Sequence, residues 1–194
     1  MSALNLTRSM ERLIVDIVAR VPELSHIEPE RVLVCVASTR SGGVHGTYAK
    51  IHPLRFRGGE SVMASRCGMK KVRYIMPAVT RKGVDMLYIV YFLLPRFLNL
   101  TLREKLITII HELYHISPEF DGDIRRFPGK NYAHGSSRKR YNDTMSQLAE
   151  RYLQAFDDES LVSFLEGDMA AIRTRHRVIV GRRLAAPRIR METD

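Results

Sequence analysis

The chain has 194 residues, of which 45% are hydrophobic and 27% are charged, and its formal net charge is +10 at pH 7. This length suits one ordinary domain that can bury enough apolar surface to fold without disulfides or a structural metal. The composition excludes a disordered chain. The positive charge favours polyanionic partners, namely nucleic acid, an anionic membrane surface or acidic proteins, without choosing among them.

Cysteine content and hydropathy indicate the compartment. Cys35 lies in the apolar run 32–36 and is expected to be a buried thiol, whereas Cys67 precedes Gly68 in a turn-like stretch. Without C-x-x-C spacing, both are predicted to be free thiols of a reducing compartment. The most apolar window, Met86 to Leu94, has about nine residues, against roughly twenty in a membrane span. Charged residues interrupt any signal-peptide pattern, so we expect a cytoplasmic protein.

The first two elements are a helix and a strand. Apolar residues recur at helical spacing from Met10 to Val21, and this predicts an amphipathic helix that Ser9 could cap and Pro22 ends. The β-branched apolar run from Arg31 to Ala37 predicts a buried strand.

Further strands are expected before residue 95. The predicted segments are Val44–Phe56, Lys71–Met76 and Val84–Leu94. Their short connections imply an antiparallel or mixed sheet.

After these strands the apolar period becomes helical. Thr101 and Glu104 have the spacing of a capping box, so a helix is predicted to begin there and to run to about His115. Three segments follow: a polar loop over 117–137, a helix over Arg138–Phe156 and a shorter helix over Ser160–Leu165. Strands followed by helices predict an α+β fold.

The sequence His111-Glu112-Leu113-Tyr114-His115 lies on that predicted helix. Residues four apart share one helix face, so His111 and His115 can direct nitrogens at one metal ion. Zn²⁺ suits imidazole ligands and leaves a position for water, from which Glu112 is placed to take a proton. The pattern predicts a zinc-dependent hydrolase of the zincin type.

A third ligand is needed. His134 is the first candidate, because it lies downstream within reach and Gly135 allows a close approach. Asp121 is the alternative: it occupies the third-ligand position of the extended metzincin pattern, although Pro118 replaces a glycine there. Glu150 on the following helix would be the thermolysin-like choice.

Other side chains are candidates for supporting roles. Tyr132, and also Tyr141, could donate a hydrogen bond to a transition-state oxyanion, although either could simply pack. His45 and His52 lie on the second predicted strand and could line the cleft.

The motif on this helix and the segment after it resemble those of the phage-type metallopeptidases, which are related to the small SprT-like zincins. The resemblance covers roughly Val32 to Phe156 and is sharpest from Leu106 to Gly135. It rests on His111 to Pro118, Phe120 to Phe127 and Tyr132 to Gly135. It implies a compact zincin core with a small sheet, an N-terminal helix, an active-site helix and a backing helix. It also implies that His134 completes the zinc site and that the substrate is a protein or peptide.

We expect one metallopeptidase domain over residues 1–166 and an arginine-rich segment over 167–194. Two other functions remain open. The spacing His111-x3-His115-x5-Asp121 is similar to the histidine pattern of a bacterial endoribonuclease. A non-catalytic protein could instead bind nucleic acid through the basic segment, whose arginines are Arg173, Arg175, Arg177, Arg182, Arg183, Arg188 and Arg190. A solvated tail would carry the same residues.

Overall fold

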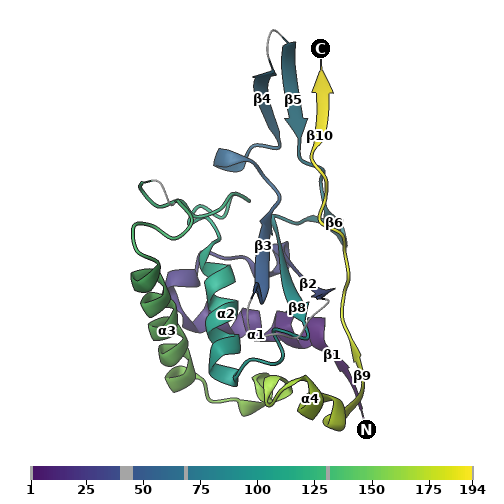
Figure 1. The fold of residues 1–194 in the computed structure, drawn as a ribbon, viewed down its shortest axis with the longest axis vertical. Helices are drawn as coiled ribbons and strands as arrows, with labels where there is room; N and C mark the ends of the chain where they lie inside the picture. The colour runs from purple at the N-terminus through teal and green to yellow at the C-terminus, as the bar shows by residue number, and fades with distance from the viewer. Residues whose placement is uncertain (1, 40–45, 68–69, 130–131, 194) are drawn as a thin grey trace.

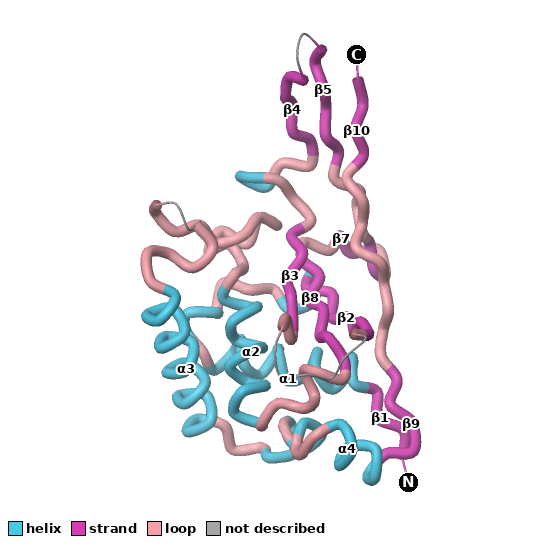
Figure 2. Tube along the Cα trace, viewed as in Figure 1, coloured by secondary structure: helices cyan, strands magenta, loops and turns pink. Residues whose placement is uncertain are grey.

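The computed structural model describes residues 2–39, 46–67, 70–129 and 132–193 (Figures 1 and 2). Its centre is a mixed sheet in which β8 (Tyr88–Leu94) lies between β2 (Val32–Ser38) and β3 (Ala49–Pro53). β2 runs parallel to β8, and β3 runs antiparallel to it. Helices pack on this sheet, so the α+β fold is confirmed.

The two faces of the central sheet bury different sets of residues, because successive side chains of a strand point to opposite faces. Val34 and Val90 belong to the main core with helices α1 (Leu6–Arg20), α2 (Leu102–Tyr114) and α3 (Arg138–Ala155). Residues one position further along form a smaller second core. Its members are Leu33, Cys35, Leu54, Met86, Ile89 and Tyr91. All three long helices therefore contribute to the core on one face.

Helix α1 begins earlier than the sequence pattern predicted. Its N-cap is Asn5, whose side chain accepts a hydrogen bond from the backbone N–H of Arg8 at 3.0 Å. The predicted cap, Ser9, lies inside the helix. Leu6 is fully buried and extends the apolar stripe by one turn, and this burial favours the earlier start.

The predicted strands were partly right. β2 agrees with its prediction, whereas β3 is shorter than Val44–Phe56, and residues 44–45 lie outside the described residues. The run Val84–Leu94 is not one strand: β7 (Val84–Asp85) pairs with β6 (Thr80–Arg81), and β8 begins at Tyr88. Met86 and Leu87, between β7 and β8, are buried although they are not in a strand. Because the apolar run continues through them, no pattern in the sequence indicated that the strand is interrupted there.

A second, three-stranded sheet projects beyond the central one (Figure 1). It pairs β5 (Lys70–Ile75) with β4 (Val62–Cys67) on one side and with β10 (Arg190–Thr193) on the other. β4 was not predicted, because its described side chains are exposed and form no buried alternating pattern. β5 agrees closely with the predicted strand Lys71–Met76.

The remaining elements lie towards the C-terminus. In place of the predicted helix over Ser160–Leu165 there are two short 3-10 turns, Glu159–Leu161 and Ser163–Leu165. α4 (Met169–Arg175) follows, and β9 (His176–Val180) pairs in parallel with β1 (Ser2–Asn5).

Cys35 is a buried free thiol, as predicted, while the side chain of Cys67 lies outside the described part of the chain. Among the described helices, none is long and apolar enough to cross a membrane.

Candidate metal centre

Helix α2 positions the motif. Thr101 and Glu104 form the predicted capping box: the Glu104 N–H donates to Thr101 Oγ1 at 3.3 Å, and the Thr101 N–H donates to Glu104 Oε2 at 2.9 Å. The fully buried stripe of α2 then anchors the helix to the core. That stripe consists of Leu106, Ile109, Ile110 and Leu113. His111 lies in the last turn of the helix, and His115 is its C-cap.

Three imidazole rings converge at this end of α2. The Nε2 atoms of His111 and His115 are 3.0 Å apart, and Nε2 of His134 lies 3.4 Å from that of His111. Two nitrogen ligands of one tetrahedral zinc ion are separated by about 3.3 Å when each Zn–N bond is about 2.05 Å. The three ligand atoms all lie within 4.8 Å of one another. The spacing therefore fits a single metal ion.

The protonation of these rings also fits metal binding. Burial lowers the pKa of His111 to about 4, and burial together with the neighbouring histidines lowers the pKa of His115 to about 3. Burial, and then the charge of Arg138, lowers the pKa of His134. At neutral pH the three rings are therefore uncharged, and an uncharged imidazole is the form that coordinates a metal.

The side chain of Glu112 is buried next to β3. Only 8% of its surface is exposed, and its carboxyl group accepts a hydrogen bond from the backbone N–H of Ile51 on β3. Burial raises the pKa of this carboxyl to about 7. A carboxyl group with a pKa near neutrality can both accept and return a proton. The role of Ile51 could not be foreseen, because no local pattern links β3 to α2.

The chain turns sharply after α2 and is tied back to it. The N–H of Arg125 donates to the carbonyl of His115 at 2.7 Å, and Ile116 forms an isolated β-bridge with Ile124. The guanidinium group of Arg125 lies 4.2 Å from the ring centre of Tyr114 and donates to its carbonyl. These contacts hold the end of α2, and thus His115, in place.

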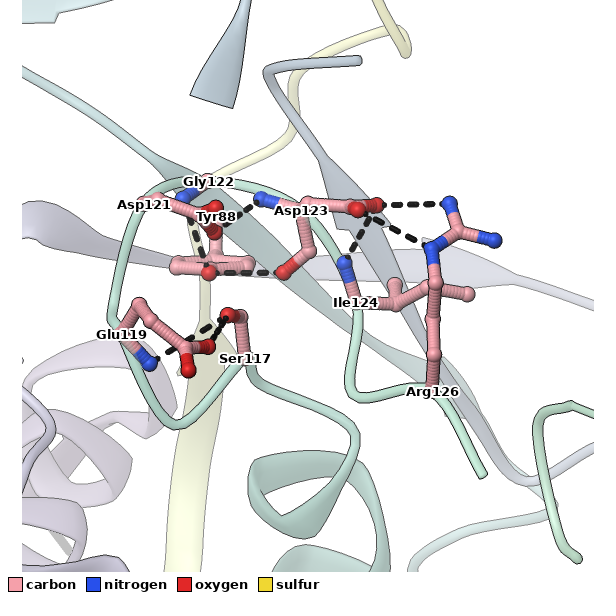
Figure 3. A network of polar contacts seen from close by, with 8 residues as sticks. All are labelled: Tyr88, Ser117, Glu119, Asp121, Gly122, Asp123, Ile124 and Arg126. Carbon is pink, nitrogen blue, oxygen red and sulfur yellow. Dashed lines mark hydrogen bonds and ion pairs between the residues drawn. The ribbon is translucent and has the colours of Figure 1, made fainter. Parts of the chain in front are cut away.

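Tyr88 on β8 organises the same turn (Figure 3). Its hydroxyl accepts from the N–H of Gly122 at 2.9 Å and donates to the carbonyl of Asp123 at 2.7 Å. Gly122 has a φ of +90°, and a Cβ there would lie 2.5 Å from Cγ of Arg55. Only glycine meets both conditions without strain.

Asp121 belongs to this turn. Its Oδ1 accepts the N–H of Asp123 at 3.0 Å, so the carboxylate stabilises the backbone (Figure 3). The group of potential ligands found among the described residues contains His134 and not Asp121.

The two candidate tyrosines lie in different surroundings. Tyr141 is buried, and its ring centre lies 4.8 to 5.8 Å from those of all three histidines. Its hydroxyl has no hydrogen-bond partner among the described residues, and burial followed by the charge of Glu112 raises its pKa. Tyr132 is half exposed and lies beside the guanidinium of Arg126. The position of Tyr141 is the better one for contacting a group bound at the cluster.

The other candidate residues are placed elsewhere. Glu150 forms an ion pair with Arg103, His52 has a buried Nε2 without a partner in the described part of the chain, and His45 lies outside the described residues. Among the tail arginines, Arg182 pairs with Glu11. The others are exposed: Arg173, Arg175, Arg177, Arg183, Arg188 and Arg190.

The fold and the histidine group together define an α+β protein with a site that could bind a metal ion. The model of one family, described as putative phage metallopeptidase, matches residues 5–152, which span β2, β8, α2 and His134. The chain belongs to this family, and the resemblance inferred from its motifs is confirmed. No curated protein and no solved structure was found to match the chain.

Proposed function

We propose that this protein is a zinc-dependent peptidase. The observation that carries the proposal is the convergence of His111, His115 and His134 next to the buried carboxyl group of Glu112. A zinc ion held by the three imidazoles would act as a Lewis acid and make water acidic enough to react at neutral pH. Family membership supports a protein or peptide as the substrate.

Glu112 is the proposed general base. It takes a proton from the attacking water and returns it to the leaving amide nitrogen, so its carboxyl must alternate between two protonation states. The raised pKa, about 7, suits that exchange. Tyr141 is the proposed oxyanion donor, because its buried hydroxyl has a hydrogen to donate and no partner among the described residues.

The edge of β3 that does not pair with β8 is the proposed binding site for the peptide backbone. β3 is an edge strand of its sheet. The Leu54 N–H donates a hydrogen bond to the Leu87 carbonyl, so Leu54 directs its backbone groups towards β8. Successive residues of an antiparallel strand direct these groups to alternate sides, and the N–H and carbonyl of Ile51 therefore point away from β8. A substrate strand could pair with these groups by β-augmentation. It would then lie beside Glu112, which already contacts Ile51.

The test compares Glu112→Gln with Glu119→Gln, an exposed glutamate in the turn after α2. Both proteins are loaded with zinc, their metal content is measured, and cleavage of casein is followed by mass spectrometry. We expect Glu112→Gln to keep its zinc and to lose activity by a factor of at least about 100, while Glu119→Gln stays near the wild type. Equal activity of all three proteins would refute the assigned role.

The same experiment includes a labelled RNA, with and without chelator. The spacing that suggested an endoribonuclease depends on Asp121 as a ligand, and Asp121 instead stabilises the turn after α2. We therefore expect no chelator-sensitive RNA cleavage. Cleavage of RNA but not of casein would favour the nuclease.

A further inference from the structure

A cavity of about 430 Å³ lies between the end of α2 and the beginning of α3. This volume is within the range of pockets that bind small ligands or side chains, about 300 to 1,000 Å³. Its lining comes from the end of α2, the loop before α3 and the first turns of α3. The lining includes Tyr114, Phe127, His134, Arg140, Tyr141 and Thr144.

The cavity adjoins the metal centre. His134 and Tyr141 belong both to its wall and to the ring cluster around the motif, with their ring centres 4.8 Å apart. A chain bound at the metal site can therefore place a neighbouring side chain in the cavity. The cavity would be close enough to the reacting bond for the side chain that it binds to influence which peptide bond is cleaved.

The inner wall is aromatic. The ring centres of Tyr114 and Tyr141 are 5.8 Å apart, and that of Phe127 lies 5.9 Å from Tyr141 and 6.5 Å from Tyr114. Such a wall binds large apolar side chains, because burying apolar surface against it yields about 25 cal/mol for each Å² removed from water.

The charge of the cavity is positive. Among the described residues that line it, Arg140 is the only one with a permanent charge, and none is acidic. The first turn of α3 contains Arg138, Lys139 and Arg140, and in the described structure none of them forms an ion pair with an acidic side chain. A helix N-terminus already carries a positive partial charge, so the guanidinium group of Arg140 in the cavity wall favours an anion as its partner.

We propose that this cavity binds a large apolar side chain of the peptide substrate, and that Arg140 selects an acidic group adjacent to it. The inference rests on the proposed peptidase function and adds a substrate preference to it. A carboxylate of the substrate would pair with a guanidinium group that has no acidic partner in the described structure, while the apolar side chain fills the aromatic part of the cavity.

The first experiment determines the cleavage preference. Zinc-loaded wild-type protein is incubated with a mixed peptide library, and the cleaved bonds are identified by mass spectrometry. Matched peptides then carry Phe or Ala at the preferred position and Glu or Lys beside it. We expect kcat/KM to be highest for the peptide with Phe and Glu.

Matched variants then test the two parts of the cavity. Arg140→Glu and Lys139→Glu make the same charge change in the same exposed helical turn, but only Arg140 lines the cavity. Arg140→Glu should shift the Glu-to-Lys preference by about tenfold, and Lys139→Glu should change it little. Thr144→Phe, which fills the cavity, should lower kcat/KM for the Phe peptide more than for the Ala peptide. Asn142→Phe, at an exposed position of α3 outside the cavity, should not.

A binding measurement distinguishes an error in the proposed substrate preference from an error in the proposed peptidase function. Labelled peptides are titrated by fluorescence anisotropy into zinc-loaded Glu112→Gln protein with and without Arg140→Glu. Cleavage without preference, or equal effects of the two charge variants, would overturn the inference and leave the peptidase standing. Selective binding without any cleavage by the wild type would overturn the peptidase and leave the cavity as a peptide site. Neither binding nor cleavage would overturn both.

Discussion

The carboxyl group of Glu112 on α2 accepts a hydrogen bond from the backbone N–H of Ile51 on β3. This contact joins the proposed general base to the strand edge that is proposed to bind substrate. A peptide that pairs with β3 would compete for the same N–H, so binding of substrate and release of the carboxyl group would be coupled.

The ligand set predicts which substitutions remove the metal. We expect wild-type protein and Asp121→Ala to purify with zinc, whereas His134→Ala loses most of it, because the third imidazole is needed to hold the ion. Metal content per chain is measured by mass spectrometry after dialysis against a weak chelator. Asp121→Ala should cost only about 1 kcal/mol of stability, through one lost hydrogen bond. Loss of zinc in Asp121→Ala with retention in His134→Ala would reverse the assignment.

Replacing Tyr141 or Tyr132 by phenylalanine removes one hydroxyl group, and we expect different effects at the two positions. Tyr141→Phe should lower kcat for casein or peptides by about 100-fold, because it removes the proposed oxyanion donor. It should leave the melting temperature unchanged, since the Tyr141 hydroxyl has no partner within the described structure. Tyr132→Phe should change neither quantity. Equal activity of Tyr141→Phe and wild type would contradict the proposed role.

Lys105 predicts a stability effect away from the site. It is fully buried on α2, and its ammonium group donates to the carbonyls of Leu165 at 2.6 Å and Gly167 at 2.5 Å. Lys105→Met leaves both carbonyls without that donor, so the free energy of unfolding should fall by about 2 to 4 kcal/mol. Urea denaturation measures this change. Lys139→Met, at an exposed lysine, serves as the control and should stay within about 0.5 kcal/mol of the wild type.

Cys35 predicts a pH effect. Burial raises the pKa of its thiol to about 11, so in the folded protein it stays protonated, and unreactive, at pH 8. In a Cys67→Ser protein, a thiol reagent should label Cys35 at pH 8 only after unfolding. Since the thiolate is favoured in the unfolded chain, this thiol should lower stability as the pH rises from about 9 towards 11, and the decline should be smaller in Cys35→Ala. Rapid labelling of the folded protein at pH 8 would contradict the burial of this thiol.

Sequence patterns predicted the helices and strands that are determined by residues close together in the chain. The capping box at Thr101 and the apolar stripe after it determined where α2 begins, and helical geometry then brought His111 and His115 to one face. The long helix α3 was predicted from its own apolar stripe. The apolar run of β2 predicted a buried strand. The start of α1 was misplaced, because nothing local distinguished Asn5 from Ser9 as the cap.

Contacts between distant segments decided the rest. The position of His134 depends on how the chain after α2 returns to that helix, and the sequence left Asp121 open as a second choice on spacing alone. The partner of Glu112 comes from β3, and the cavity beside the histidines is assembled from α2, the following loop and α3. Side-chain periodicity reports which face of an element is buried but not which element will cover it. The sequence by itself therefore determined the α2 motif and ranked His134 first as its third partner, while only the tertiary structure brought His134 to the motif, placed β3 next to Glu112 and formed the cavity beside them.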